Sequence, residues 1–418
     1  MAPSPSRQTM AIVSTVPVLA HRRILLGVTG SIAAYKAAEL ASLLTQSGAV
    51  VDVVLSEAAQ HFVTPLTFSA VTGRRAYSDA DLWGQDSHIL HVELGRGAEA
   101  VLVAPATAHT LAKLAAGHAD TLLCLAALAS RRPLLLAPAM DAGMFEAPAT
   151  QANLDVLRRR GAVILGPAEG RMASGLSGLG RLLEPEEILG WLRLTLGRSG
   201  PLAGRSLIIT AGGTHEPIDP VRVIANRSSG RQGFALAQAA IDRGAAVTLI
   251  SGPSTLATPV GAERVDVTTA AEMQQAVMER LEAADVLLMA AAVADFRSEP
   301  NAQKIKRAQG ALTLTLQPTQ DILGLVAQRR KKGSRPRVVV GFAAESQDLV
   351  ANARLKARDK GLDLIVANDI LAPDSGFAVE TNRVTLIDTA GSVQELPLMT
   401  KAEVAEVVLE RVGGLLNA

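Results

Sequence analysis

A chain of 418 residues is long for one compact domain, and its 48% of hydrophobic residues can fill two buried cores. Its 41 basic and 40 acidic residues nearly cancel, which excludes a strong general attraction to nucleic acids or anionic membranes. Two tryptophans and two tyrosines are too few for a surface that stacks single-stranded bases.

Cys124 is the only cysteine, so an intrachain disulfide and a cysteine zinc site are both excluded. This usage fits a reducing compartment, and we expect a cytoplasmic protein. No apolar run reaches the length of a membrane span. Residues 1–20 hold a mildly apolar stretch that Pro17 interrupts, which makes a poor signal peptide. We therefore expect residues 1–20 to be a disordered tail.

The first half opens with a βαβ pattern. An apolar strand is expected at residues 24–28, a helix at 33–46 and a second strand at 50–55, with Gly48 ending the helix. Further strands are expected at 100–104, 134–137 and 162–165, with one long helix over roughly 110–130.

The second half repeats this order. A strand at 207–210 is followed by glycines, a helix at 230–243 and a strand at 247–250. Further strands are expected at 286–290, 338–341, 364–367 and 384–388. Residues 197–204 are rich in Gly, Ser and Pro and suit a linker. The sequence thus predicts two Rossmann-like, doubly wound α/β domains, at 21–196 and 205–418, with ligands beyond the carboxyl ends of the strands.

In the first half, Thr29-Gly30-Ser31 follows a strand and begins a helix, where backbone amides and a hydroxyl can hold a phosphate. The glycines do not spell the dinucleotide fingerprint, and no Walker A sequence occurs. A plain packing role for these glycines therefore stays open at this point.

Three later segments help to decide between a phosphate site and a packing role for these glycines. They are His91-Val92-Glu93-Leu94-Gly95, the loop at 103–108 and the loop at 136–140. Over residues 22–191 the chain resembles the homo-oligomeric flavin-containing cysteine decarboxylases. The resemblance implies an FMN-dependent phosphopantothenoylcysteine decarboxylase with His91 in its active site. In that family FMN oxidises the substrate thiol, which gives the electrons of the departing carboxylate a sink. The implied FMN contacts are Gly30, Ser31, Ile32, Ser56, Pro105, Ala106, Thr107 and Met140.

Two residues depart from that family. Asp141 stands where it commonly has the asparagine that binds the substrate carboxylate, and Ser174 where it has a proton-donating cysteine. A hydroxyl is a far weaker acid than a thiol. We predict that a neutral Asp141 binds the carboxylate and supplies the proton. The alternatives are that these two substitutions have no functional effect or that they weaken the decarboxylase. Cys124 is expected to be a core residue.

In the second half, the segment from Thr210 to Arg222 and the helix start at Asn226-Arg227-Ser228-Ser229-Gly230 bring amides, hydroxyls and a guanidinium to one strand end. That set suits a phosphate-bearing ligand. Packing glycines with a capping serine are the simpler account. Lys356 and Lys360 share a helix face, which in many helices is only a solvated face.

Together with Ala290-Ala291-Ala292-Val293-Ala294-Asp295, Lys304-Ile305-Lys306 and Gly341-Phe342-Ala343-Ala344-Glu345, these segments resemble the phosphopantothenate–cysteine ligase family over 205–412. The resemblance implies CTP, Mg2+ and an acyl cytidylate, with Asn226 and Lys304 catalytic, while the Mg2+ ligands stay unknown. It places CTP against Ala290, Ala291, Asp295, Lys304, Gln320, Asp321, Ile322, Leu323, Phe342, Lys356 and Lys360. It places 4′-phosphopantothenate against Arg222, Asn226, Ser228, Ser229 and Gly230.

The two halves are complementary because the product of the ligase is the substrate of the decarboxylase. The resemblance thus implies a bifunctional enzyme of coenzyme A biosynthesis with no nucleic-acid or membrane partner. It also implies a homo-oligomer of ligase dimers and decarboxylase trimers, together a dodecamer. The alternatives are an active ligase with an impaired decarboxylase, an NAD(P)-dependent oxidoreductase, and a non-catalytic flavin-binding regulator.

Overall fold

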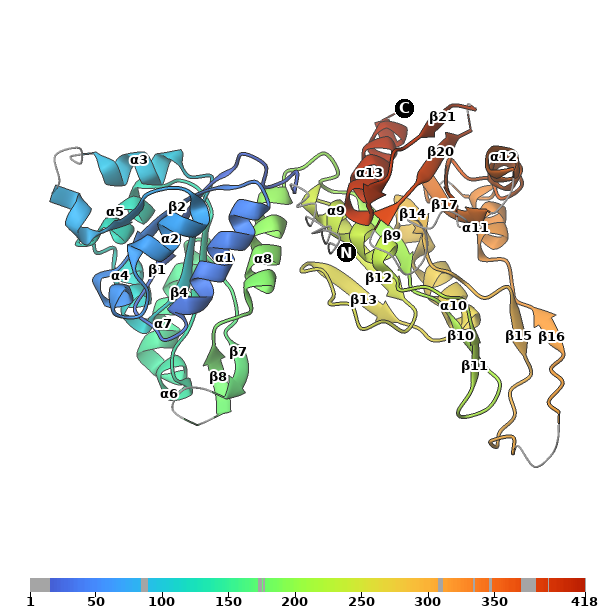
Figure 1. The fold of residues 1–418 in the computed structure, drawn as a ribbon, viewed down its shortest axis with the longest axis horizontal. Helices are drawn as coiled ribbons and strands as arrows, with labels where there is room; N and C mark the ends of the chain where they lie inside the picture. Colours follow the sequence, from blue (N-terminus) through green and yellow to red (C-terminus); the bar gives the residue numbers. More distant parts are fainter. Residues whose placement is uncertain are drawn as a thin grey trace, which may run out of the picture. The chain divides into compact units, whose positions relative to one another are not determined.

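The computed structural model describes residues 16–83, 89–171, 175, 177–306, 311–333, 335–345, 348–369, 381–389 and 391–417. The chain forms two compact units, Met1–Leu196 and Gly197–Ala418. Each unit has a central sheet with helices on both faces (Figure 1).

Within the described residues, the sheet of the first unit has six parallel strands in the order β3-β2-β1-β4-β5-β6. They are β1 (Arg23–Val28), β2 (Val50–Leu55), β3 (Ala76–Ser78), β4 (Ala100–Ala106), β5 (Leu134–Pro138) and β6 (Val163–Ile164). The chain adds β2 and β3 on one side of β1 and then places β4 on the other side. This switch opens a crevice at the carboxyl ends of β1 and β4, where ligands bind in such sheets.

Side chains that alternate along β1 build the two cores of this unit. Ile24 and Leu26 pack toward one set of helices and Leu25 toward the other. The first set is α1 (Ala34–Gln46), α2 (Pro65–Thr72) and α8 (Pro185–Gly197). The second is α3 (Leu90–Gly97), α4 (Ala108–Ala116), α5 (Leu122–Ala129) and α7 (Pro148–Arg159). Shorter pieces are η1 (Glu57–His61), η2 (Asp79–Trp83), α6 (Ala142–Glu146) and the pair β7 (Ala168–Arg171) with β8 (Ser177–Arg181).

Two predictions for this unit were wrong. The single helix expected over 110–130 is two helices, because Gly117 adopts a left-handed φ of 75° and ends α4, and the Thr121 side chain caps α5. Residues 16–20 of the expected tail are packed against the unit. Leu19 is fully buried in the core, and the backbone N–H of Val16 donates to the carbonyl of Ser47 at 3.0 Å.

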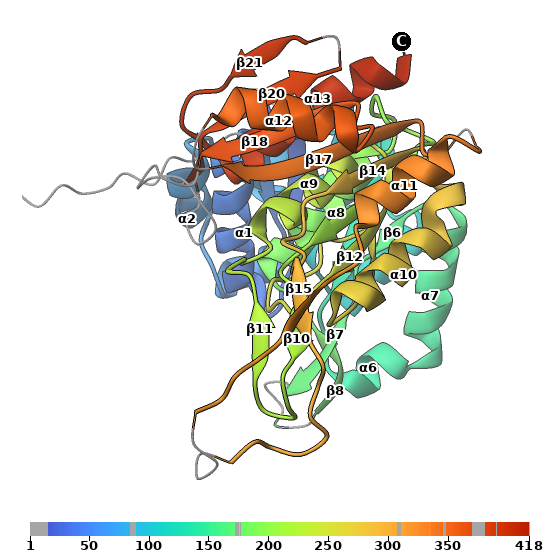
Figure 2. The ribbon, with the colours of Figure 1, turned by 90° about the vertical axis from the view of Figure 1, so that its right-hand side faces the viewer.

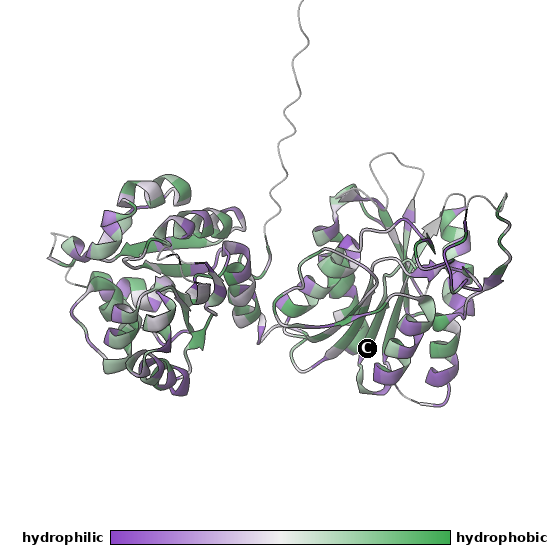
Figure 3. Ribbon diagram, turned by 90° about the horizontal axis from the view of Figure 1, so that it is seen from below, coloured by the Kyte–Doolittle hydropathy of each residue, from purple (hydrophilic) through white to green (hydrophobic). Residues whose placement is uncertain are grey.

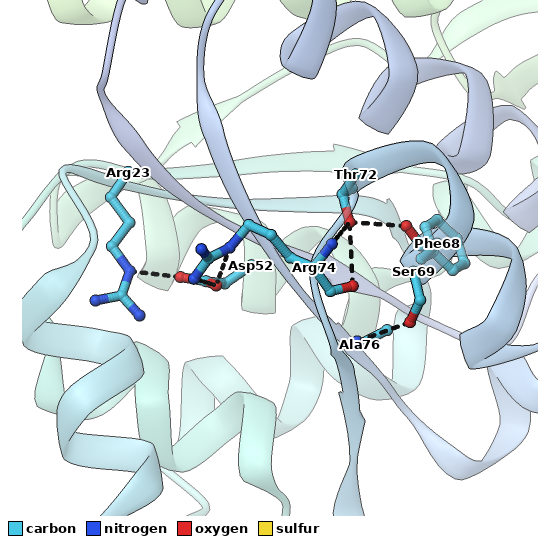
Figure 4. Close-up of polar contacts among 7 residues, drawn as sticks. All are labelled: Arg23, Asp52, Phe68, Ser69, Thr72, Arg74 and Ala76. Carbon is cyan, nitrogen blue, oxygen red and sulfur yellow. Dashed lines mark hydrogen bonds and ion pairs between the residues drawn. The ribbon is translucent and has the colours of Figure 1, made fainter.

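A buried carboxylate fastens one edge of this sheet (Figure 4). Asp52 in β2 is 2% exposed and accepts hydrogen bonds from Arg23 and, at 2.9 and 2.6 Å, from Nε and Nη2 of Arg74. The Thr72 hydroxyl fixes the turn that carries Arg74, because it accepts the backbone N–H of Arg74 at 3.2 Å. A buried carboxylate is tolerated when it is paired in this way. The contacts therefore hold the end of α2 and the start of β3 onto β2.

In the second unit, the described strands follow the order β13-β12-β9-β14-β17-β18-β20-β21. They are β9 (Ser206–Ala211), β12 (Ala246–Ser251), β13 (Ala262–Asp266), β14 (Val286–Met289), β17 (Val338–Glu345), β18 (Leu364–Asp369), β20 (Val384–Asp388) and β21 (Val393–Glu395). The strands are parallel except β20 and β21, which pair antiparallel. The order switches between β9 and β14, so a second crevice is expected at their carboxyl ends.

One face of this sheet is covered by α10 (Ala270–Arg280), α11 (Ile322–Arg330) and α12 (Leu349–Asp359), and the other by α9 (Arg231–Asp242) and α13 (Lys401–Asn417) (Figure 2). Small elements are η3 (Leu281–Ala283) and the antiparallel pairs β10 (His215–Pro217) with β11 (Val223–Ala225), β15 (Phe296–Ser298) with β16 (Leu316–Pro318), and β19 (Thr381–Asn382) with β22 (Met399–Thr400).

Apolar residues concentrate on the strands of both units and polar ones on the outer faces of the helices (Figure 3). The two doubly wound α/β units confirm the predicted fold class. Over the part of the chain that the structure describes, no helix is both long and apolar enough to cross a membrane.

Candidate functional site

A cavity of about 790 Å³ opens at the carboxyl ends of β1 and β4 in the first unit. Its wall comes from the turn before α1, the start of η1, the turn before α4 and the loop after β5. The structure thus brings together most of the residues predicted for this half. Those on the wall are Gly30, Ser31, Ile32, Ser56, Thr107, Met140 and Asp141.

The Thr29 hydroxyl links two of the turns that form this cavity. The Thr29 hydroxyl donates to the carbonyl of Pro105 at 2.7 Å and accepts the backbone N–H of Thr107 at 3.1 Å, which joins the ends of β1 and β4. A Cβ added to Gly30 would lie 2.4 Å from the Cβ of Ala58, so the turn and η1 approach as closely as a glycine allows. The amino ends of α1 and α4 therefore meet at one wall, where their free N–H groups favour an anion.

Three predicted residues lie elsewhere. Pro105 and Ala106 are buried behind the wall, and Pro105 contributes through the carbonyl bonded to Thr29. His91 lies half-buried in the first turn of α3 and is not among the described residues that line the cavity of a single chain. Ser174 falls outside the described residues. The roles predicted for these side chains stay predictions.

The cavity wall also carries charged and sulfur-bearing groups that the sequence analysis did not assign. Lys36, 7% exposed, ion-pairs with Glu184 at 2.7 Å, and this contact lowers the pKa of Glu184. Burial raises the pKa of Asp79, which accepts the backbone N–H of Leu122 at 2.8 Å, and burial also raises the pKa of Cys124. Cys124 is in the core as predicted, and it also reaches the wall. Lys36 could have been proposed as a site residue from the sequence, because it is a charged residue at the mostly apolar start of α1. No sequence pattern indicated Asp79.

The second unit has a cavity of about 450 Å³ at the carboxyl ends of β9, β14 and β17. It unites five segments that are separate in the sequence. The predicted residues on its wall are Asn226, Ser228, Ser229, Gly230, Ala290, Ala291, Asp295, Gln320, Asp321, Ile322, Leu323, Phe342, Lys356 and Lys360.

Side chains near β9 hold the loop after β14 in place. The Thr210 hydroxyl accepts the backbone N–H of Ala291 at 3.1 Å, and the Thr214 hydroxyl accepts that of Ala294 at 2.9 Å. Asn226 donates through Nδ2 to the carbonyl of Val293 at 3.0 Å. Gly230, with a left-handed φ of 76°, caps α9, so the free N–H groups of this helix open into the cavity.

Lysines make this cavity suitable for a polyanion. Lys356 and Lys360, one helical turn apart at the end of α12, both line it, which argues against a merely solvated face. Lys360 forms an ion pair with Asp321, which precedes α11. Lysine charges beside a helix amino end favour phosphate groups.

Arg222 and Lys304 were predicted at this site, but neither is on the wall that the described residues form. Arg222 pairs with the carboxylate of Asp219 and donates through Nη2 to the carbonyl of Ile305 at 2.8 Å. The Arg222 guanidinium holds the pKa of Asp219 far below its ordinary value. Arg222 therefore fixes the backbone next to Lys304, whose own side chain is exposed.

Six polar residues on the same wall were missed: Arg231, Gln232, Thr319, Asn368, Asn382 and Lys401. The first three adjoin predicted segments, whereas the sheet topology alone brings Asn368, Asn382 and Lys401 to this cavity. Among the described residues, no group of three His, Cys, Asp or Glu side chains is placed to hold a metal ion.

Comparison with known proteins agrees with this division. Residues 15–195 match the family model described as Flavoprotein, and residues 202–415 match the DNA/pantothenate metabolism flavoprotein C-terminal domain. The coenzyme A biosynthesis bifunctional protein CoaBC of Bacillus subtilis (strain 168) is 43% identical over 402 residues, covering 95% of this chain and 98% of that protein. The protein of that name from Mycobacterium tuberculosis (strain ATCC 25618 / H37Rv) is 44% identical over 404 residues, covering 94% and 96%.

Among solved structures, the C-terminal domain of a coenzyme A biosynthesis bifunctional protein CoaBC is 37% identical, with a TM-score of 0.45, and covers 52% of this chain and 99% of that one. Both family models fall on the units that carry the two cavities, and the curated relatives span both units. The chain therefore belongs to the family of the coenzyme A biosynthesis bifunctional protein CoaBC.

Proposed function

We propose that the chain is a bifunctional enzyme of coenzyme A biosynthesis. The ligase domain predicted at 205–418, in the second unit, joins 4′-phosphopantothenate to cysteine with CTP and Mg2+. The decarboxylase domain predicted at 21–196, in the first unit, converts the resulting phosphopantothenoylcysteine to 4′-phosphopantetheine with FMN. The observation that carries the proposal is that each unit gathers its own motif residues around its own cavity, at the switch point of its sheet.

The first cavity fits FMN. The amino ends of α1 and α4, together with the Ser31 and Ser56 hydroxyls, suit the anionic phosphate of FMN. Ile32, Leu123 and Met140 offer apolar surface for a ring system. When bound, FMN would take electrons from the substrate thiol and return them after CO2 has left.

The chain's own residues then have to orient the substrate and move protons. Asp141 lines the cavity, where in its protonated form it can donate a hydrogen bond to the substrate carboxylate and afterwards deliver the proton. Ser174 is too weak an acid for that task. His91 is expected to act in the oxidation step from a neighbouring copy, because it is not on the cavity wall of its own chain.

For ligation, a carboxylate oxygen of 4′-phosphopantothenate attacks the α-phosphorus of CTP, and pyrophosphate leaves. The amine of cysteine then attacks the acyl carbon, the bond to CMP breaks, and the ammonium proton is lost to solvent. The α9 amino end, Lys356 and Lys360 offset the phosphate charge, and Asn226 orients the acyl phosphate. Lys304, which is not on the wall formed by the described residues, is expected to approach the bound nucleotide from the segment that Arg222 fixes.

An active ligase beside an impaired decarboxylase is the second candidate, and the departures at Asp141 and Ser174 favour it. Each half can be tested alone. Purified protein given phosphopantothenoylcysteine should be yellow and release CO2 and 4′-phosphopantetheine, whereas the second candidate yields neither product. Given 4′-phosphopantothenate, cysteine and Mg2+, it should form phosphopantothenoylcysteine faster with CTP than with ATP. No condensation product with either nucleotide would overturn the ligase half.

The proposal also includes a homo-oligomer in the cytoplasm, with trimer contacts between first units and dimer contacts between second units. Their combination predicts a dodecamer. Sedimentation of the purified protein tests this directly, and a monomer at micromolar concentration would contradict it.

A further inference from the structure

We propose that Lys36 and Glu184 are positioning residues for decarboxylation, because their ion pair holds in place the loop that carries Asp141. The inference rests on the proposed decarboxylase function of the first unit. It assigns a role to a buried lysine for which the flavin motifs of this half provide none. Neither Lys36 nor Glu184 has to touch the substrate in this role.

Residues 180–184, here called the brace, comprise the end of β8 and the turn before α8. At one end of the brace, the carbonyl of Gly180 accepts the backbone N–H of Met140 at 3.0 Å, in the loop after β5. In its middle, Leu182 and Leu183 are buried in the core that also holds α1, α2 and α8. The brace therefore connects the loop after β5 to the interior of the unit.

Glu184 lies at the other end of the brace and accepts from two cations. Nη2 of Arg181 donates to its Oε1 and Nζ of Lys36 donates to its Oε2, each at 2.7 Å. The contact with Lys36 lowers the pKa of Glu184, so the carboxylate stays ionised at neutral pH. Because each oxygen has its own donor, movement of the carboxylate away from α1 would break the contact between the brace and that helix.

The two partners of this ion pair differ in exposure. The side chain of Lys36 is 9% exposed, whereas that of Glu184 is 54% exposed. Ion pairs on the surface contribute little to stability, but a buried ammonium needs a compensating anion. Without Lys36, the carboxylate of Glu184 would be free to turn into solvent. Without Glu184, the ammonium of Lys36 would have to find another partner, and in both cases the brace would lose its contact with α1.

These contacts form a continuous path from α1 to Asp141. The loop after β5 is fixed on a second side, where the backbone N–H of Ala139 donates to the carbonyl of Ala106 at 3.2 Å. Asp141 follows directly and lines the cavity. A proton donor has to lie within hydrogen-bond reach of the atom that it protonates. A shift of about 1 Å in a catalytic group can cost roughly a hundredfold in rate, so a loosened brace should slow decarboxylation.

Direct binding of an anion is the competing role, because Lys36 itself lines the cavity. The structure favours the positioning role. The ammonium of Lys36 is engaged by Glu184, and Arg181 holds that carboxylate from its other side. A ligand anion would have to displace a carboxylate that already has two cationic donors.

The test compares Lys36→Met and Glu184→Gln with a control, Asp155→Asn. Asp155 matches Glu184 because its side chain is 57% exposed and pairs with Arg158 at 3.0 Å. It lies in α7, and no described residue of that helix lines the cavity. Each brace variant should lower kcat for supplied phosphopantothenoylcysteine about tenfold or more while its flavin content, measured by visible absorbance, stays at the parental level. Asp155→Asn should leave kcat within twofold.

Two further readouts separate positioning from a direct chemical role. Hydrogen exchange at the amide of Met140 should be faster in both brace variants, because its contact with Gly180 opens more often. The double variant of Lys36→Met and Glu184→Gln should be no slower than the slower single variant, because both changes break one contact.

A folded brace variant, as judged by its thermal transition, with a kcat within twofold of the parent would overturn the inference. Loss of flavin from Lys36→Met would overturn it too, because the lysine would then serve the flavin directly. Rate losses that multiply in the double variant would show that the two residues act separately. If Lys36→Met does not fold, Glu184→Gln decides by kcat and by exchange at Met140. A parent protein that forms no product contradicts the proposed decarboxylase instead, so the two failures are distinguishable.

Discussion

Arg222 and Asp219 form an ion pair that organises the segment beside Lys304. Nε of Arg222 donates to Oδ2 of Asp219 at 3.0 Å, and that oxygen also accepts the backbone N–H of Ile305 at 3.2 Å. Oδ1 of Asp219 accepts the backbone N–H groups of Val221 and Arg222, each at 2.9 Å. One carboxylate thus fixes two segments that are 86 residues apart in the sequence.

The first prediction concerns pH. Because the pKa of Asp219 is lowered in the folded protein, its stabilising effect is complete above the unfolded carboxyl pKa of about 3.9 and is lost as the pH falls through the folded pKa. We expect Asp219→Asn to lower the Tm of the second unit by several degrees at pH 7, and the difference from the parent to shrink below about pH 4. Calorimetry over this range is the measurement.

Asp266 offers a matched control for that experiment, because its side chain is 70% exposed and pairs with Arg264. Asp266→Asn should change the Tm little at any pH. A difference for Asp219→Asn that grows as the pH falls would contradict the assigned direction of the pKa.

The second prediction separates the two activities through Lys304. Removing its charge should slow ligation roughly a hundredfold, since one lost electrostatic contact to a transition state costs about that much. Decarboxylation of supplied phosphopantothenoylcysteine should not change in Lys304→Gln. Lys332→Gln, an exposed lysine of the same unit, serves as the control. A ligation rate of Lys304→Gln equal to that of the parent would contradict the catalytic role of Lys304.

The third prediction concerns Gly30. Alanine there would place a Cβ 2.4 Å from that of Ala58 and push the turn before α1 away from η1. We expect Gly30→Ala to retain little flavin after gel filtration, as measured by visible absorbance, and to keep full ligase activity. In Gly413→Ala the new Cβ meets nothing within 4 Å, so bound flavin should not change. Full flavin content in Gly30→Ala would contradict a flavin at this wall.

The fourth prediction concerns Asp141, whose Oδ1 caps α6 by accepting the backbone N–H of Gly143 at 3.1 Å. Asn keeps a capping oxygen but has no acidic proton. If Asp141 supplies the proton, Asp141→Asn should slow decarboxylation roughly a hundredfold with little change in Tm. Single-turnover release of CO2 measures this step. A rate equal to that of the parent would contradict the role of Asp141 as the proton donor.

Much of the fold could be predicted because strand and helix periodicity in both units is undisturbed. The apolar run at Leu25 and Leu26 and the helix ended by Gly48 required no tertiary information. The break between α4 and α5 escaped prediction because segments rich in Ala and Leu lie on both sides of residues 117–121, so composition hid the helix end at Gly117. Leu19 shows the same limit, since its burial depends on contacts with the rest of the unit.

The sites were predictable where one segment carries several contacts, as at Asn226 and Ser228. They were not predictable where a residue's role depends on a distant partner. Arg222 stands in a motif that suggests phosphate binding, yet its guanidinium is engaged by Asp219 and Ile305. Lys401 reaches the second cavity only because β19 pairs with β22 and α13 packs beside α9.

The most direct test of the account is one reaction followed by mass spectrometry. Purified protein is given 4′-phosphopantothenate, cysteine labelled at its carboxyl carbon, CTP and Mg2+. The account predicts that phosphopantothenoylcysteine rises first and then falls as 4′-phosphopantetheine and labelled CO2 appear in equal amounts. Phosphopantothenoylcysteine that accumulates without labelled CO2 would contradict the bifunctional claim and leave the ligase alone.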